Sequence, residues 1–297
     1  MSYAAMALSI LLSVINACLL RKYNDAGKKG LNVYLFNAGI SGVWIVILLV
    51  LLIVSDNTWN PLAVFYGVLY GVVLFAFLLF KTLSMANGPI SLSTLIGSCA
   101  FLIATAFGVL YCKESVRPVQ IIGMILLMLS LVLCVNPKKS KEKLSPKWML
   151  YCLGFFLAGG FVGIIYKLFG RSSAGNEKEV MMLTAAVTAM LLFLIFGMLL
   201  SRKSGGRILP DRKSLLFILL SGMASCGYIR MNLSLSNLIP SVVFFPVSNG
   251  GMVILSTIAA RLIYQEKLTA RQLWGIACGC IAVILVGCGD YLLGFLF

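Results

Sequence analysis

Apolar residues gather in ten long runs separated by short polar connections. Each run has 18 to 24 residues, and an α-helix needs roughly 20 apolar residues to cross a bilayer. Because backbone groups in hydrocarbon need partners within their own segment, these lengths favour helices over tilted strands. The runs are 3–20, 31–54, 61–83, 89–112, 118–135, 148–169, 180–200, 214–236, 240–263 and 272–295.

A short pattern of Glu, Gln and Gly occurs twice, once in each half of the chain. The matched pairs, each 152 positions apart, are Glu114 with Glu266, Gln120 with Gln272, and Gly123 with Gly275. The pattern predicts a duplication, with a first repeat at 1–137, a basic linker at 138–147 and a second repeat at 148–297. Five helices per repeat is an odd number, so the second copy enters the membrane in the opposite direction. We therefore expect an all-α integral membrane protein with ten transmembrane helices arranged as two inverted five-helix repeats.

Composition excludes a soluble domain of this size. Sixty-one per cent of the residues are hydrophobic, against roughly 45–50% in soluble domains. The net charge of +15 reflects basic residues between the apolar runs, which is typical of membrane topology rather than of nucleic-acid binding. Of the 24 Lys and Arg residues, 18 lie in or beside the odd-numbered connections. The positive-inside rule therefore puts these connections in the cytoplasm and both termini outside.

Residues for metal or covalent chemistry are scarce. The chain has no histidine, and most of its nine cysteines lie inside apolar runs, where cysteine behaves as a small hydrophobe. No phosphate-binding loop, nucleophile triad or redox motif is present in the sequence. We expect no enzyme activity, no metal site, no cofactor and no nucleic-acid partner.

The repeated Glu, Gln and Gly residues resemble the drug/metabolite transporter superfamily, in its two-repeat EamA-like branch. The resemblance covers essentially the whole chain. It implies a central cavity between the halves, lined by the third, fourth, eighth and ninth helices, that works by alternating access. Two features depart from the family: residues 13–17 read Ser-Val-Ile-Asn-Ala in place of an aromatic–glycine signature, and family members keep both termini in the cytoplasm.

No acidic residue is predicted deep inside a span, and Asp290 falls near the end of the run 272–295. Glu114 and Glu266 could form acid–base pairs, but the sequence favours a role in starting the helices that follow. Thr269 with Gln272 has a capping-box pattern that fits this role. Glu179 falls in the connection before the run 180–200. The lack of a buried carboxylate argues against an exporter of lipophilic cations.

Lys81, Lys167 and Arg230 are basic residues that fall inside apolar runs. Charges in spans are costly and are candidates for binding sites, although long basic side chains also extend to the membrane surface. The nearby polar residues that favour Arg230 are Ser225, Tyr228 and Asn232.

The run 240–263 is predicted to be interrupted at 246–251, which reads Pro-Val-Ser-Asn-Gly-Gly. Its counterpart in the first half is 96–99, which contains Ser98. Matching interruptions indicate a substrate site at mid-membrane, and close packing through small residues is the alternative. Ser248 and Asn249 are therefore candidate ligands. The aromatic residues Trp44 and Tyr70 either stack on substrate or pack between helices.

The sequence thus predicts a multi-pass secondary transporter in the plasma membrane, either monomeric or homodimeric. Its expected substrate is a small anionic or zwitterionic metabolite, such as an amino acid, a carboxylate or a phosphorylated compound. A coupling proton or a counter-substrate is a candidate partner besides the lipid bilayer. Two alternatives remain: an exporter of hydrophobic drugs or organic cations, and a non-transporting scramblase or assembly partner.

Overall fold

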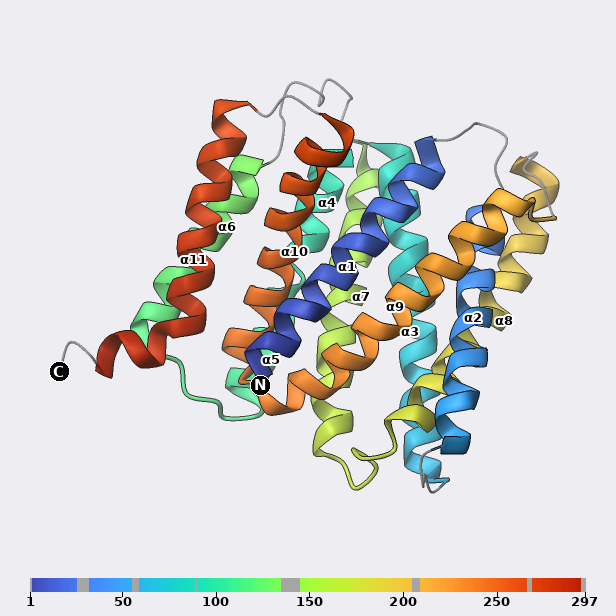
Figure 1. Ribbon diagram of the computed structural model, residues 1–297, viewed down its shortest axis with the longest axis horizontal. Coiled ribbons are helices and arrows are strands. Elements are labelled where there is room, and N and C mark those ends of the chain that lie inside the picture. Colours follow the sequence, from blue (N-terminus) through green and yellow to red (C-terminus); the bar gives the residue numbers. More distant parts are fainter. Residues whose placement is uncertain are drawn as a thin grey trace. The chain divides into compact units, whose positions relative to one another are not determined.

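The computed structural model describes residues 2–25, 32–54, 59–88, 90–134, 145–204, 209–265 and 269–294. Every regular element in these ranges is an α-helix (Figure 1). The helices are α1 (Ser2–Asp25), α2 (Val33–Val54), α3 (Pro61–Asn87), α4 (Ile90–Ser98), α5 (Phe101–Leu110), α6 (Pro118–Cys134), α7 (Pro146–Arg171), α8 (Lys178–Ser204), α9 (Arg212–Leu238), α10 (Ser241–Tyr264) and α11 (Ala270–Gly294).

The predicted membrane helices are present. Nine segments of the described chain are long and apolar enough to cross a bilayer, and the shorter apolar helix α6 makes a tenth. One of the nine spans Leu92–Leu110 and consists of α4 and α5 together. The protein is therefore an all-helical, multi-pass membrane protein.

Local signals in the sequence set where several helices start. Pro61, Pro118 and Pro146 occupy the first positions of α3, α6 and α7, where the missing N–H of proline is not needed. Polar side chains cap other backbone N–H groups: Asn32 accepts from Tyr34 at 2.9 Å and Asp211 accepts from Ser214 at 2.9 Å. Such caps satisfy donors that the first turn of a helix leaves free.

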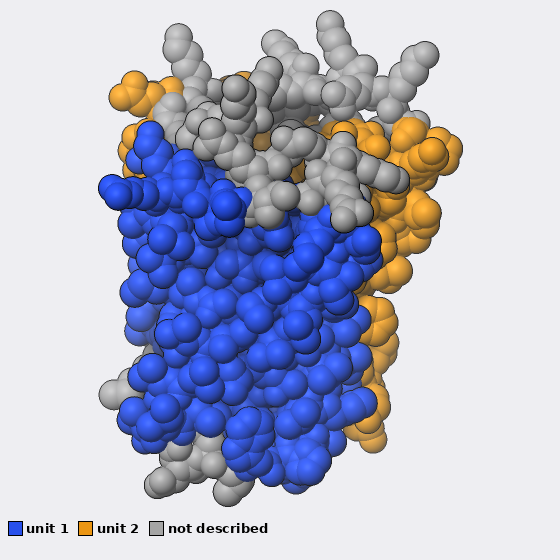
Figure 2. Space-filling view, turned by 90° about the vertical axis from the view of Figure 1, so that its right-hand side faces the viewer, with its two compact units in different colours: residues 1, 3–75, 168–234 blue, residues 2, 76–167, 235–297 orange. Residues whose placement is uncertain are grey.

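The α-helices fall into two compact units, coloured separately in Figure 2. Unit 1 comprises Tyr3–Phe75 and Leu168–Ser234, and unit 2 comprises Ala76–Lys167 and Leu235–Phe297. Each unit draws residues from both halves of the sequence. Within unit 1, α2 packs against α8, and within unit 2 the closest partners are α6 and α11.

Glycines allow the close helix contacts of unit 1. A methyl group at Gly67 of α3 would lie 2.5 Å from the carbonyl oxygen of Met181 in α8, and one at Gly71 would lie 2.7 Å from that of Ala185. Two glycines four residues apart therefore bring α3 against the backbone of α8, as small residues do in membrane helix pairs.

The two connections that carry the repeated motif have the same local structure. Lys113 has φ 53° and Gln265 has φ 52°, and these are the non-glycine residues of positive φ among those described. The side chain of Gln120 accepts a hydrogen bond from the N–H of Arg117 at 3.0 Å. That of Gln272 accepts one from the N–H of Thr269, also at 3.0 Å. Each matched pair is again 152 positions apart.

The Thr269–Gln272 capping box is confirmed, because the N–H of Gln272 also donates to Oγ1 of Thr269 at 3.3 Å. Glu266, the second glutamate of the repeated pattern, lies outside the described residues.

Helices α6 and α11 make reciprocal contacts (Figure 1). A methyl group at Gly123 would lie 2.7 Å from Cγ2 of Val286, and one at Gly275 would lie 2.8 Å from Sγ of Cys134. Val286 is 152 positions after Cys134, so each contact has its counterpart on the other helix. The start of α6 thus meets the end of α11, and the start of α11 meets the end of α6, which makes the pair antiparallel.

Candidate functional site

Two carboxylates, the buried Glu179 and the half-buried Glu114, lie against basic side chains of the membrane helices, one in each unit. In unit 2 Glu114 pairs with Lys167 of α7, and in unit 1 Glu179 pairs with Arg230 of α9. Glu179 was predicted to lie in a connection, and this was wrong: it lies in the first turn of α8 and is buried, so the expected lack of a buried carboxylate was wrong as well. An acidic residue is favourable there because the N-terminus of a helix carries partial positive charge. The sequence signal that could have placed Glu179 in the helix is its position directly before the apolar run 180–200, where a first helical turn favours an acidic residue.

The unit 2 pair is a closed cluster. The ammonium of Lys167 donates to Oε1 of Glu114 at 2.9 Å and to the carbonyl of Ile239 at 3.2 Å. Oε2 of Glu114 accepts from the N–H of Ser241, the first residue of α10, at 2.5 Å. The Lys167 side chain is only 4% exposed and that of Glu114 only 13%.

Hydrogen bonding outweighs burial at Glu114. Its carboxylate lies in the connection between α5 and α6, where burial alone would raise the pKa. The hydrogen bonds from Lys167 and Ser241, together with the charge of Lys167, lower the pKa below its ordinary value. Glu114 therefore caps the N-terminus of α10. The sequence favoured this kind of role, but for α6, the helix that follows Glu114 in the chain.

The unit 1 pair is open on one side. Arg230 donates from Nη2 and from Nε to the same oxygen of Glu179, at 2.6 and 3.1 Å. The Arg230 side chain is 43% exposed, whereas that of Glu179 is 7% exposed. A guanidinium has five N–H donors, so Arg230 retains donors for a further acceptor.

The polar residues expected around Arg230 lie on another face of α9. Ser225, Tyr228 and Asn232 recur at intervals of three and four residues and share one face, while Arg230 is about 140° around the helix from Ser225. The indole N–H of Trp44 in α2 donates to Oγ of Ser225 at 2.8 Å. Trp44 and Ser225 therefore join two helices in the interior of unit 1.

Asn232 carries a buried polar atom without a hydrogen bond. Its Oδ1 finds no partner among the described residues. Tyr70 in α3 is also in unit 1 and is 1% exposed, which fits packing between helices and leaves it no surface for stacking on substrate.

The remaining candidates lie in unit 2. Lys81 in α3 is half-buried, and no carboxylate of the described residues pairs with it. Asn249 of α10 donates its amide to the carbonyl of Phe245 at 3.0 Å, one turn earlier. Oγ of the adjacent Ser248 is buried and finds no partner in the described chain.

The predicted interruptions of the two matched runs differ. The first is present: α4 ends at Ser98, and α5 begins at Phe101. The second is absent, because α10 continues through Pro246 to Tyr264 (Figure 1). Proline removes one main-chain hydrogen bond, and in hydrocarbon a break would leave more backbone groups without partners. The prediction that 246–251 interrupts this helix was therefore wrong.

Of the ten predicted site residues, unit 1 holds Trp44, Tyr70, Tyr228, Arg230 and Asn232, and unit 2 holds Lys81, Ser98, Lys167, Ser248 and Asn249. The structure joins Arg230 and Lys167 to carboxylates, and it joins Trp44 to Ser225, which the sequence noted only as a neighbour of Arg230.

Comparison with known proteins shows a shared fold. No protein-family model and no curated protein matches the chain. A solved structure described as "Crystal structure of protein" aligns with 98% of this chain and 99% of its own, with a TM-score of 0.75 and 13% sequence identity. At this identity the similarity establishes the fold alone: this helical arrangement occurs in another protein of known structure.

Proposed function

We propose that the protein is a secondary active transporter of a small organic metabolite, and that Arg230 binds the anionic group of the substrate. The proposal rests on the pairing and the exposure of Arg230 in the membrane helix α9. Its guanidinium is held by a buried carboxylate and is still 43% exposed. Charged residues in membrane spans are costly and usually serve function.

Charge compensation narrows the substrate class. Arg230 and Lys167 are each neutralised by a carboxylate, so no uncompensated positive charge at these two positions attracts an anion. A zwitterion, such as an amino acid, would place its carboxylate on the free donors of Arg230 while bringing no net charge. Within the anionic or zwitterionic class expected from the sequence, we therefore favour a zwitterion.

The reciprocal contacts of α6 and α11 support the inverted repeat. A pseudo-two-fold axis makes residue i of one copy contact residue j of the other, and the reverse. Gly123 with Val286 and Gly275 with Cys134 have this relation. Inverted repeats of this kind underlie alternating access in secondary transporters. We infer that the two five-helix repeats move against each other in the transport cycle.

The test is substrate uptake into proteoliposomes that contain the purified protein. Labelled zwitterionic amino acids, dicarboxylates and organic cations are compared, and saturable uptake of a zwitterion that is lost in Arg230→Ala supports the proposal. The matched control is Arg171→Ala, which removes an exposed arginine at the end of α7 in the same unit. Uptake of cations alone, unchanged in Arg230→Ala, would favour the exporter of hydrophobic cations. Lipid scrambling without solute uptake would favour the non-transporting alternative.

A further inference from the structure

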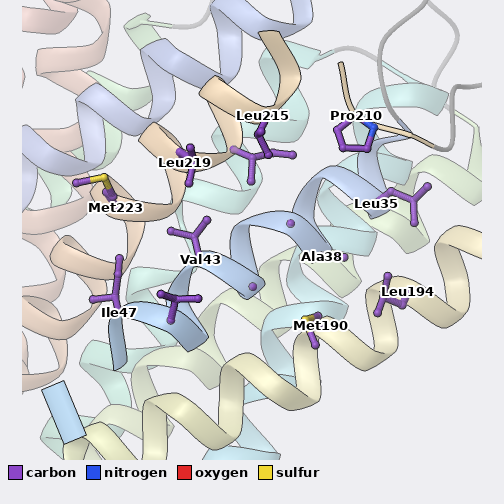
Figure 3. A pocket seen from close by; sticks show the side chains of 14 residues that line it. Leu35, Ala38, Val43, Ile47, Met190, Leu194, Pro210, Leu215, Leu219 and Met223 are labelled. Atoms are coloured by element: carbon purple, nitrogen blue, oxygen red, sulfur yellow. The ribbon is translucent and has the colours of Figure 1, made fainter. Parts of the chain in front are cut away.

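An apolar groove lies between α2, α8 and α9 of unit 1 (Figure 3). Its volume is about 660 Å³, within the roughly 300–1,000 Å³ typical of ligand pockets. All 14 residues that line it are apolar. The groove opens on the surface of the protein, because Val46 and Met223 in its wall are 63% and 60% exposed.

Glycines and small residues of α2 form the floor of the groove. A methyl group at Gly39 would touch Ile218 of α9 at 3.0 Å, so this glycine brings α2 and α9 together. A methyl group at Gly42 would meet only Sδ of Met190, at 4.0 Å. The space above Gly42 is therefore open, and a side chain placed there would occupy the groove.

The groove has the depth of one leaflet. Along α2 it extends from Leu35 to Ile47, a rise of about 18 Å at 1.5 Å per residue. One leaflet contributes about half of the roughly 30 Å hydrocarbon core. Pro210, Leu215 and Leu35 lie at one end of the groove in Figure 3, and Ile47 and Met223 lie at the other. The end with Pro210 is therefore at the level of the membrane surface.

Basic residues stand at that end. Arg212 and Lys213 open α9 two and three positions after Pro210, and both are exposed. Arg212 is about 60° around the helix from Leu215 in the lining, whereas Lys213 is about 160° from it. Neither pairs with a carboxylate among the described residues. Asp211 lies between them and Pro210, and its carboxylate accepts a hydrogen bond from the N–H of Ser214 at 2.9 Å. Residues 211–213 at the mouth thus carry a net positive charge, on the side that the sequence predicts to be cytoplasmic, where anionic lipids are concentrated.

We propose that this groove binds one anionic phospholipid, with an acyl chain along Gly42 and the phosphate at Arg212. The apolar lining and the leaflet depth match an acyl chain. The positive mouth matches a phosphate headgroup and selects anionic over zwitterionic lipids. This site is independent of the proposed transport function, since it requires only that the protein lies in a membrane.

The experiment is native mass spectrometry of the delipidated protein in detergent with added dioleoyl phosphatidylglycerol or dioleoyl phosphatidylcholine. We expect one retained phosphatidylglycerol per chain and weaker retention of phosphatidylcholine. One basic residue near an anionic surface contributes about a fivefold change in affinity, so Arg212→Gln is expected to weaken phosphatidylglycerol binding about fivefold. Lys213→Gln is the matched control, because Lys213 is also exposed and is the next residue of α9, on the face away from the groove. It is expected to have no effect.

Filling the groove tests the acyl chain. Gly42→Leu is expected to abolish retention of phosphatidylglycerol, and Gly42→Ala is expected to preserve it. The melting temperature without lipid reports whether Gly42→Leu folds, and Val46→Trp fills the groove from its exposed wall if it does not.

Three results would overturn the proposal. Equal retention of both lipids with no effect of Arg212→Gln would mean non-selective contact with the bilayer. Dimers in place of lipid adducts would make the groove an interface with a second copy. Displacement of the lipid by inorganic phosphate alone would mean that the acyl chain does not bind.

Discussion

The Lys167–Glu114 and Arg230–Glu179 pairs have the same chemistry but different surroundings. Lys167 has its carboxylate at 2.9 Å and a carbonyl at 3.2 Å, and its side chain is 4% exposed. Among the described residues the guanidinium of Arg230 has one partner, a carboxylate oxygen, and the side chain is 43% exposed. The first pair holds helices in place, and the second leaves donors accessible. An ion pair in a membrane helix is therefore a candidate binding site only when one partner remains exposed and has hydrogen-bond donors that the pair does not use.

The largest expected effect comes from breaking the closed pair. Lys167→Ala leaves Glu114 buried without its cation, and removing one partner of a buried pair costs about 3–5 kcal/mol of unfolding free energy. Denaturant unfolding in detergent micelles measures this loss.

A double-mutant cycle separates the free energy contributed by the ion pair from that contributed by the packing of the Lys167 side chain. Lys167→Met combined with Glu114→Gln is expected to recover much of the stability lost in Lys167→Met alone, because no buried charge is left unpaired. A loss below 1 kcal/mol in Lys167→Ala would show that this pair is not a structural one.

The open pair is expected to affect transport more than stability. A charge-assisted hydrogen bond contributes about 1.5–3 kcal/mol, so Arg230→Ala is expected to lower kcat/KM for uptake roughly 10- to 100-fold. Arg230→Lys keeps the charge but loses the planar fork, and an intermediate rate is expected. Initial rates in proteoliposomes give these values. Unchanged rates in both variants, with lower unfolding free energy, would make Arg230 a second structural residue.

The smallest expected effect is the pH dependence of the closed pair. The pKa of Glu114 is lowered in the folded protein, so its ionised form stabilises the fold. This contribution is complete above the ordinary glutamate pKa of about 4.3 and is lost as pH falls through the folded-state pKa. Melting temperatures between pH 7 and pH 3 are expected to decline less in Glu114→Gln than in the wild type. Parallel curves would indicate that Glu114 does not contribute to acid unfolding.

The local features of this chain were accessible from its sequence. Ten apolar segments follow from hydrophobicity alone, because hydrocarbon forces the backbone into helices of a set length. The cap that Gln272 provides to Thr269 is also local, since both residues lie within one turn. The repeat of Gln120 and Gln272 predicted a duplication, and Lys113 and Gln265, which are also 152 positions apart, have matching backbone conformations.

Only the tertiary structure decided which charges are neutralised and where a groove lies. Glu179 and Arg230 are 51 residues apart, and Glu114 and Lys167 are 53 apart, so no local spacing indicates either pair. The continuity of α10 through Pro246 likewise depends on whether the surroundings can satisfy freed backbone groups. The groove between α2, α8 and α9 exists because Gly39 and Gly42 lack side chains where three helices meet. Which helices meet is set by the packing of the whole fold, and the pattern along a single chain segment does not contain it.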